Sequence, residues 1–150
     1  MLRLSRKTLL ALEAVIDIAF NARPEPVQAR EITARQGVPQ RYLEQVMQQL
    51  VRAGILKGVR GPRGGYELAR ERRRITVGEI VRTAMSLSTA DPDDLGANSL
   101  LLERVIDPAV RKAGETFLAN LDSITVEAMC DQAEQAHVLD DEKATGDFAI

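Results

Sequence analysis

The chain has 150 residues, of which 45% are hydrophobic and 28% are charged, and its formal net charge is -2. That length can bury the core of one domain with an extension, and no run approaches the roughly 18 apolar residues of a membrane span. One cysteine excludes an intramolecular disulfide, and one histidine is too few for a structural zinc site or a histidine-activated nucleophile, so we predict that the protein is not an enzyme.

The charges are unevenly distributed along the chain. Residues 1–85 contain 16 lysines and arginines against 8 aspartates and glutamates, whereas residues 86–150 contain 4 against 14. The basic part suits a polyanion such as nucleic acid, although a chance division of solvated charges would give the same counts. The basic start lacks the apolar run and cleavage site of a signal peptide, so we expect a cytoplasmic protein.

Two helices are predicted in the first 37 residues. The first, capped by Ser5, should run from residue 6 to about residue 21. We expect its inward side to carry four apolar residues, Leu9, Leu12, Ile16 and Ala19. The second should span residues 29–35 and end at Gly37, after a short strand at Val27.

A third helix is predicted from Pro39 to just before Gly54, because helices accept proline at their first position and often end at glycine. One side carries an apolar stripe, Leu43, Val46, Leu50 and Val51. The other side carries long polar side chains that can donate to or accept from base edges, Gln40, Arg41, Glu44, Gln45 and Gln48. The second and third helices therefore form a candidate helix-turn-helix. In such a motif the third helix would enter the major groove, and Gln28 would approach a phosphate.

A β-hairpin is predicted after the third helix. Residues 55–59 have a strand pattern, the turn lies at residues 61–65, and the chain returns through residues 66–68. Arg60 and Arg63 lie at the tip, where glycines allow close approach to phosphates or to a minor groove. Loop arginines more often serve solubility, but the adjoining glutamine-rich helix favours contact with DNA. A phosphate-binding loop of a nucleotide-binding enzyme is disfavoured, because these glycines lead into a strand and Gly-Lys-Ser/Thr is missing.

The segment after the hairpin holds four arginines and a glutamate at residues 70–74. We interpret it as a solvated linker, with a patch that flanks the DNA as the alternative. Thr76 and Glu79 then predict a capping box and a helix that ends near residue 85. Residues 86–98 are acidic and aperiodic, which predicts a loop.

A long apolar helix is predicted from Ser99, with a kink near Ile106 because Pro108 interrupts the hydrogen bonding. Its apolar surface needs a cover, either its own domain or a second subunit. A short helix capped by Thr125 should follow, and the tail at residues 139–150 is expected to be disordered. The predicted fold class is mainly α with a small β-wing: a winged helix-turn-helix domain (1–85), an acidic loop (86–98), and a long dimerisation helix with a short C-terminal helix (99–138).

Short motifs between residues 42 and 80 carry a family resemblance. They read YLEQ at 42–45, RAG at 52–54, VRGP followed by GGY within 59–66, and ITVGEI at 75–80. Together they resemble the IscR-type (Rrf2) family of bacterial winged helix-turn-helix regulators. The resemblance covers residues 2–85 well and the remainder loosely. The resemblance implies a homodimer in which the long helices of the two subunits cross. It also implies a repressor, because bound dimers of this family commonly occlude a promoter. A two-fold dimer would read a palindromic operator.

The resemblance also raises the question of a sensor. Many members of the family hold an iron–sulfur cluster with three cysteines in the loop before the long helix, and residues 86–99 contain none. We therefore predict no cofactor and no metal site, with an unusual cluster at Cys130, His137 and carboxylates as an open alternative. Cys130 is interpreted first as a buried apolar residue and second as a redox-sensitive sensor thiol. Other members sense metabolism through an enzyme of cysteine biosynthesis, a further candidate partner.

The prediction for the whole chain is a homodimeric, sequence-specific DNA-binding transcriptional regulator, a repressor that responds to a redox, iron–sulfur or sulfur-metabolism signal. The residues expected to contact double-stranded DNA are Gln28, Gln40, Arg41, Tyr42, Glu44, Gln45, Arg60 and Arg63. The alternative is a protein-interaction module that binds a metabolic enzyme through its C-terminal half. A steep loss of nucleic-acid affinity with salt would distinguish the first function from the second.

Overall fold

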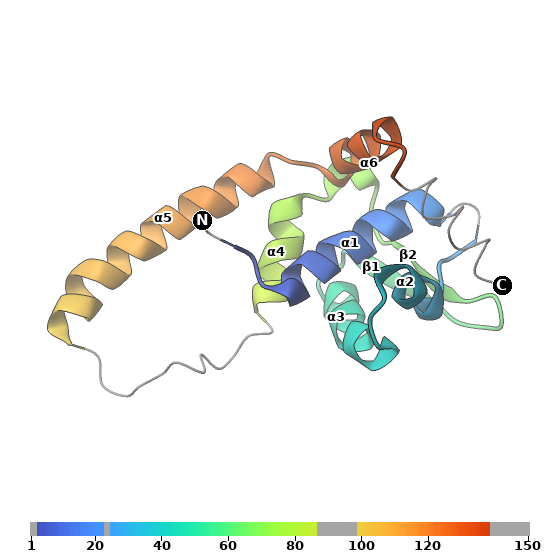
Figure 1. The fold of residues 1–150 in the computed structure, drawn as a ribbon, viewed down its shortest axis with the longest axis horizontal. Helices are drawn as coiled ribbons and strands as arrows, with labels where there is room; N and C mark the ends of the chain where they lie inside the picture. Colours follow the sequence, from blue (N-terminus) through green and yellow to red (C-terminus); the bar gives the residue numbers. More distant parts are fainter. Residues whose placement is uncertain (1–2, 23–24, 87–98, 139–150) are drawn as a thin grey trace.

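Helix α1 crosses the middle of the fold in the computed structural model, which describes residues 3–22, 25–86 and 99–138 (Figure 1). The α-helices are α1 (Arg6–Asn21), α2 (Ala29–Gln36), α3 (Gln40–Arg52), α4 (Val77–Met85), α5 (Asp107–Asp122) and α6 (Val126–Gln135). The strands are β1 (Leu56–Val59) and β2 (Gly65–Leu68). A 3-10 turn, η1 (Arg72–Arg74), precedes α4, and a π-helical turn, η2 (Leu102–Ile106), precedes α5. The predicted helices and hairpin are thus confirmed.

The helix starts are fixed by the capping residues that the sequence indicated. Ser5 Oγ accepts a main-chain N–H of the first turn of α1 at 3.2 Å. Thr76 and Glu79 form the expected capping box at the start of α4. Thr125 Oγ1 accepts a main-chain N–H of α6 at 3.1 Å. Each bond satisfies a donor that has no partner within its own helix.

The buried side of α1 differs from the predicted one. The side chains that face the core are those of Leu10, Ala11, Ala14, Val15 and Ile18. The prediction was wrong for Leu9, which is 51% exposed, whereas Ala19 is buried as expected. Leu12 and Ile16 are half-buried and pack against the edge of the core. Helix α1 contacts α2, α3, α4, α6 and β2 at once. Because apolar residues occur on most sides of such a helix, their spacing alone did not fix which side is buried.

The wing is a two-stranded antiparallel sheet in which Leu56 lies opposite Leu68. Val27 extends it by one bridge, since the Val27 N–H donates to the Tyr66 oxygen at 2.9 Å and the Tyr66 N–H donates to the Val27 oxygen at 2.7 Å. The predicted short strand at Val27 is therefore confirmed as a single residue. This bridge joins the segment before α2 to the wing.

The long helix that ends in α5 has an irregular turn just before Pro108. The turn η2 is π-helical, and the Asp107 N–H donates to the Leu102 oxygen. Pro108 follows η2 in a continuous helical run, since Ile106 and Asp107 both have αR dihedrals, so its missing N–H leaves one helical hydrogen bond unformed at this point. Figure 1 shows α5 extending away from the other helices and meeting α4 at its C-terminal end. None of the helices in the described ranges is both long and apolar enough to cross a bilayer.

The predicted acidic loop, apart from Ser86, and the predicted tail at residues 139–150 lie outside the described residues. The division of the chain into these segments stays a prediction.

Candidate nucleic-acid interface

Helix α3 presents a polar face to solvent, opposite its buried stripe. The stripe consists of Leu43, Val46, Met47 and Leu50. The exposed face consists of Gln40, Arg41, Glu44, Gln45 and Gln48. The predicted stripe is therefore confirmed at three positions, with Met47 in it and Val51 only half-buried. Because residues three and four apart are neighbours on a helix, the long polar side chains form one continuous surface.

The start of α3 lies one residue later than expected. Pro39 is the N-cap, with an extended ψ of 137°, and Gln40 is the first helical residue. No described side chain caps this helix start. The Tyr42 N–H donates to the Pro39 oxygen at 3.1 Å. The first two main-chain N–H groups of the helix have no side-chain acceptor among the described residues, an arrangement that favours an anion such as phosphate.

The exposed surface at the start of α3 also includes Tyr42 and a hydrogen bond between two of its polar side chains. Tyr42 is 42% exposed, and Gln40 Nε2 donates to Glu44 Oε1 at 3.0 Å. That bond holds the Glu44 carboxylate within the exposed face. A carboxylate in this position can accept a hydrogen bond from a cytosine amino group but repels phosphate.

The turn between α2 and α3 is short and is set by glycine. Gly37 ends α2 in the left-handed conformation, with φ of 68°, and its N–H donates to the Thr33 oxygen at 2.8 Å. Gln28 is the N-cap of α2 and half-buried, and its side chain makes no capping bond. The predicted helix-turn-helix is confirmed, with Gln28 at the start of its first helix.

The tip of the wing is a tight turn that two glycines make possible. Gly61 has φ of 113°, a region that favours glycine, and the Gly64 N–H donates to the Gly61 oxygen at 2.9 Å. A Cβ on Gly64 would collide with the main-chain oxygen of Val59. Arg60 and Arg63 are both exposed at this tip, and Arg63 Nη1 lies 3.9 Å from Glu25 Oε1. The turn therefore holds two guanidinium groups in solvent.

Tyr66 on β2 lies within electrostatic reach of Glu44 on the polar face of α3. Burial raises the pKa of the Tyr66 hydroxyl, and the negative charge of Glu44 raises that pKa further. Figure 1 shows α3 and the hairpin both below α1. The sequence did not indicate this pair, because Tyr66 reaches α3 only through the pairing of β2 in the folded chain.

The predicted DNA-contact residues thus form three groups. Five of them share α3, namely Gln40, Arg41, Tyr42, Glu44 and Gln45. Arg60 and Arg63 lie at the wing tip, and Gln28 lies at the start of α2. Their contact with DNA stays a prediction.

The solvated-linker interpretation of residues 70–74 is wrong for Arg70. Its Nε donates to the Gly54 oxygen at 3.2 Å, and its guanidinium forms a fork with the Glu79 carboxylate at 3.3 Å. Arg73 fits the interpretation better, since it is exposed and pairs with Glu71 of the same segment at 2.6 Å. Sequence spacing did not reveal the Arg70 contacts, because they join segments that meet only in the fold.

The cysteine inventory does not fit a three-cysteine iron–sulfur cluster. The chain contains one cysteine, Cys130, and its side chain lies in the core at 1% exposure. The described residues contain no group of three or more histidine, cysteine, aspartate or glutamate side chains that could hold a metal ion. The burial of Cys130 agrees with its interpretation as an apolar core residue. A sensor role for the thiol stays a hypothesis that requires α6 to open.

The sequence and the fold match one family of regulators. The model of the Rrf2 family, described as iron-dependent transcriptional regulators, matches residues 4–132. The regulator IscR of Escherichia coli is 40% identical over 80 residues, which cover 53% of this chain and 49% of the relative. The chain therefore spans about half the length of the curated relatives that it matches.

Two solved structures extend the likeness to most of the chain. T. potens IscR superposes with a TM-score of 0.70 at 36% identity, covering 90% of each chain. CymR, the global cysteine regulator of B. subtilis, superposes with a TM-score of 0.65 at 28% identity, covering 88% of this chain and 98% of that one. The chain belongs to the Rrf2 family, whose members are winged-helix, DNA-binding transcriptional regulators.

Proposed function

We propose that the protein acts in the cytoplasm as a homodimer that binds a palindromic DNA operator and represses transcription. The observation that carries this proposal is that one helix, α3, exposes a polar face while the following hairpin exposes two arginines at its tip. Figure 1 shows α3 and the hairpin both below α1. A helix in the major groove and a basic wing beside it together contact bases and backbone.

The proposed contacts follow from the chemistry of each side chain. Arg41 would donate to guanine or to a phosphate, and Glu44 would accept from a cytosine amino group. Gln40, Tyr42 and Gln45 would complete the contacts of α3. At the wing, Arg60 and Arg63 would bind phosphates or enter the minor groove, and Gln28 would donate to a phosphate.

The proposed dimer is supported by the apolar surface of the long helix. Six large apolar side chains on it are between 37% and 64% exposed, those of Leu100, Leu101, Leu102, Val105, Ile106 and Val110. The described part of the chain does not cover them. A contiguous apolar surface of this kind marks an interaction site in a protein that stays in solution. A two-fold partner would cover it and would present two copies of α3 to one duplex.

The proposed signal is a redox, iron–sulfur or sulfur-metabolism signal, and we favour sulfur metabolism acting through an enzyme of cysteine synthesis. The similarity to CymR, the global cysteine regulator of B. subtilis, supports this choice. The single cysteine of this chain, too few for a three-cysteine cluster, supports it as well. An absorbance spectrum of protein purified without oxygen, with iron and sulfide assays, tests the choice. A colourless protein with no iron or sulfide is expected, whereas visible absorbance with stoichiometric iron would return the iron–sulfur signal to first place.

The test of the main proposal is selection of bound duplexes from a randomised library, followed by affinity measurements over a range of salt concentrations. We expect the selection to yield a palindrome that is bound by two chains. The affinity should fall steeply as the salt concentration rises, because the release of counterions from DNA then becomes less favourable. A protein-interaction module would select no sequence and would show weak, sequence-independent binding. That result would favour the alternative, which affinity capture with a purified cysteine-biosynthesis enzyme would then examine.

A further inference from the structure

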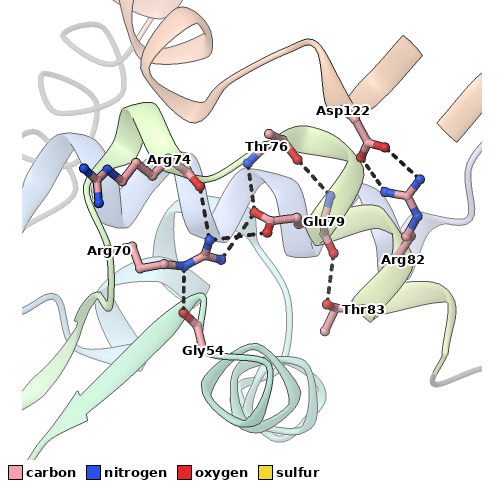
Figure 2. A network of polar contacts seen from close by, with 8 residues as sticks. All are labelled: Gly54, Arg70, Arg74, Thr76, Glu79, Arg82, Thr83 and Asp122. Atoms are coloured by element: carbon pink, nitrogen blue, oxygen red, sulfur yellow. Dashed lines mark hydrogen bonds and ion pairs between the residues drawn. The ribbon is translucent and has the colours of Figure 1, made fainter. Parts of the chain in front are cut away.

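The C-terminal end of α3 is closed by a hydrogen-bonded turn at Gly54. Gly54 has φ of 75°, its N–H donates to the Val51 oxygen at 3.1 Å, and the Ile55 N–H donates to the Leu50 oxygen at 3.0 Å. This pair of bonds is the Schellman arrangement, which leaves the oxygen of Gly54 itself available. The oxygen accepts the Arg70 Nε–H at 3.2 Å (Figure 2). Arg70 therefore binds the chain where the proposed recognition helix ends.

The same guanidinium reaches two other segments. Arg70 Nη1 donates to the Arg74 oxygen at 3.1 Å, at the end of the turn η1. Nη1 and Nη2 each lie 3.3 Å from a different oxygen of the Glu79 carboxylate. Figure 2 shows Arg70 between Gly54 and Glu79, with dashed lines from its guanidinium to the oxygens of Gly54, Arg74 and Glu79. A planar fork of this kind fixes direction as well as distance, which a lysine ammonium does not.

Glu79 is in turn fixed at the start of α4. Its carboxylate accepts the Thr76 N–H at 3.2 Å, and its own N–H donates to Thr76 Oγ1 at 3.2 Å. The capping box therefore holds Glu79 whether or not Arg70 is present. Arg70 consequently joins the end of α3 to a rigid point of α4.

Helix α4 is joined just as closely to the end of α5. Arg82 forms a two-pronged ion pair with Asp122, in which Nη2 lies 2.8 Å from Oδ2 (Figure 2). The Val77 N–H donates to the Ile124 oxygen at 2.8 Å, in the segment that directly follows α5. Gly78 lies against Asp122 so closely that a Cβ would collide with the carboxylate. Helices α3, α4 and α5 are thus linked in series by polar contacts.

We propose that Arg70 is a positioning residue, which fixes the angle of α3 relative to α5 and thereby sets the spacing between operator half-sites. This inference rests on the proposed function, since the spacing is defined only in a dimer joined through α5. The Arg70 and Glu79 side chains are partly exposed, at 37% and 40%, so their ion pair adds little to the free energy of unfolding. A restraint that contributes little to stability still narrows the orientation of the helix that it holds. Loss of the Arg70 restraint should therefore change which operator spacing the protein prefers, and should leave its melting temperature nearly unchanged.

The test measures the affinity of Arg70→Gln for the selected operator and for duplexes whose spacer is one or two base pairs shorter or longer. The wild-type chain should bind the selected spacing best. In Arg70→Gln the ratio of affinities between the best and the altered spacings should fall by about two- to tenfold, the range expected from one exposed restraint. Affinity for a duplex with a single half-site should stay within about twofold, because the polar face of α3 is unchanged.

Three further variants separate this role from a general effect on stability. Glu79→Gln weakens the two-pronged bond with Arg70, so it should also lower the ratio of affinities between the best and the altered spacings. Arg70→Lys keeps the charge without the fork, so it should behave more like Arg70→Gln than like the wild type. Arg73→Gln is the matched control, because it removes an exposed arginine whose ion pair stays within one segment, and its ratio should be unchanged. Thermal unfolding of each variant confirms that it is folded.

The outcomes distinguish this inference from the function on which it rests. An Arg70→Gln chain that keeps the wild-type spacing ratio overturns the inference alone. So does a variant whose affinity for half-site and full operator falls equally. A wild-type chain that binds no duplex, or that binds all spacings equally, overturns the proposed two-fold reading and this inference together.

Discussion

Arg35 holds the carboxylate of Asp17 in a two-pronged ion pair, with Nε 2.6 Å from Oδ2 and Nη2 2.6 Å from Oδ1. The Asp17 side chain is 5% exposed and that of Arg35 is 22% exposed. Asn21 Nδ2 also donates to Oδ1 of Asp17 at 3.0 Å. The pair joins α1 to α2, so it fixes the first helix of the helix-turn-helix on the core.

Removing either partner of this pair should have unequal effects on stability. Arg35→Ala leaves a buried carboxylate without its main partner and should lower the free energy of unfolding by about 3 to 5 kcal/mol. Asp17→Ala should cost less, because the more exposed Arg35 can turn toward water. Equilibrium unfolding in urea measures both, with Arg63→Ala as a control at an exposed pair whose loss should be nearly neutral. Equal effects of the two alanine variants would contradict the assigned burial.

A charge in the apolar surface of α5 should separate the proposed dimer. Val110→Glu places a carboxylate among exposed apolar side chains, where a partner helix would bury it without a counter-charge. We expect the dimer dissociation constant to rise by at least about tenfold, with the helical content unchanged. Sedimentation velocity over a range of protein concentrations measures the change. Lys112→Gln is the matched control, since it also lowers the net charge by one, on another side of α5, and should leave the dimer intact.

The Arg82–Asp122 ion pair should give the protein a component of acid sensitivity. The hydrogen bonds from Arg82 hold the pKa of the Asp122 carboxyl below its ordinary value of 3.8. The folded state is therefore favoured at pH above the unfolded pKa, and this contribution declines as pH falls toward the folded pKa. Asp122→Asn should be less stable than the wild type at neutral pH. The difference in unfolding free energy should shrink below about pH 4; a difference that is constant from neutral to acid pH would contradict the assignment.

The electrostatic effect of Glu44 on the wing can be followed through the titration of Tyr66. Burial and the charge of Glu44 both raise the pKa of the Tyr66 hydroxyl above 10.0. The chain has two tyrosines, so Tyr42→Phe isolates the ultraviolet titration of Tyr66. Adding Glu44→Gln should lower the midpoint but leave it above that of a free tyrosine, because burial is the larger cause. If the titration midpoint of Tyr66 is the same with and without Glu44→Gln, the Glu44 carboxylate lies too far from the wing to affect it.

The sequence predicted the local features of this fold well. Ser5, Thr76 and Gly37 act within one turn of the helix that they begin or end, so their roles follow from short-range spacing. The polar face of α3 could be predicted for the same reason, because a helix with one strongly apolar stripe must bury that stripe. The wing turn was evident from the glycines around Arg63.

The features that were missed depend on contacts between distant segments. Arg70 was assigned to a solvated linker because its neighbours are arginines, yet its acceptors lie on Gly54 and Glu79. The buried side of α1 was misplaced because most sides of that helix meet another element. The pairing of Asp17 with Arg35 joins two helices that the sequence pattern treated separately. None of these contacts has a spacing that could reveal it before the chain folds.

The central claim is that the wing and the polar face of α3 contact one duplex together. Its most direct measurement is the affinity of Arg60→Ala for the selected operator at fixed salt, with Arg73→Ala as the matched loss of an exposed arginine outside that surface. Arg60→Ala should weaken binding by about 1 to 3 kcal/mol, the range for a specific arginine contact, while Arg73→Ala should bind like the wild type. Equal affinities of Arg60→Ala and the wild type would contradict the claim.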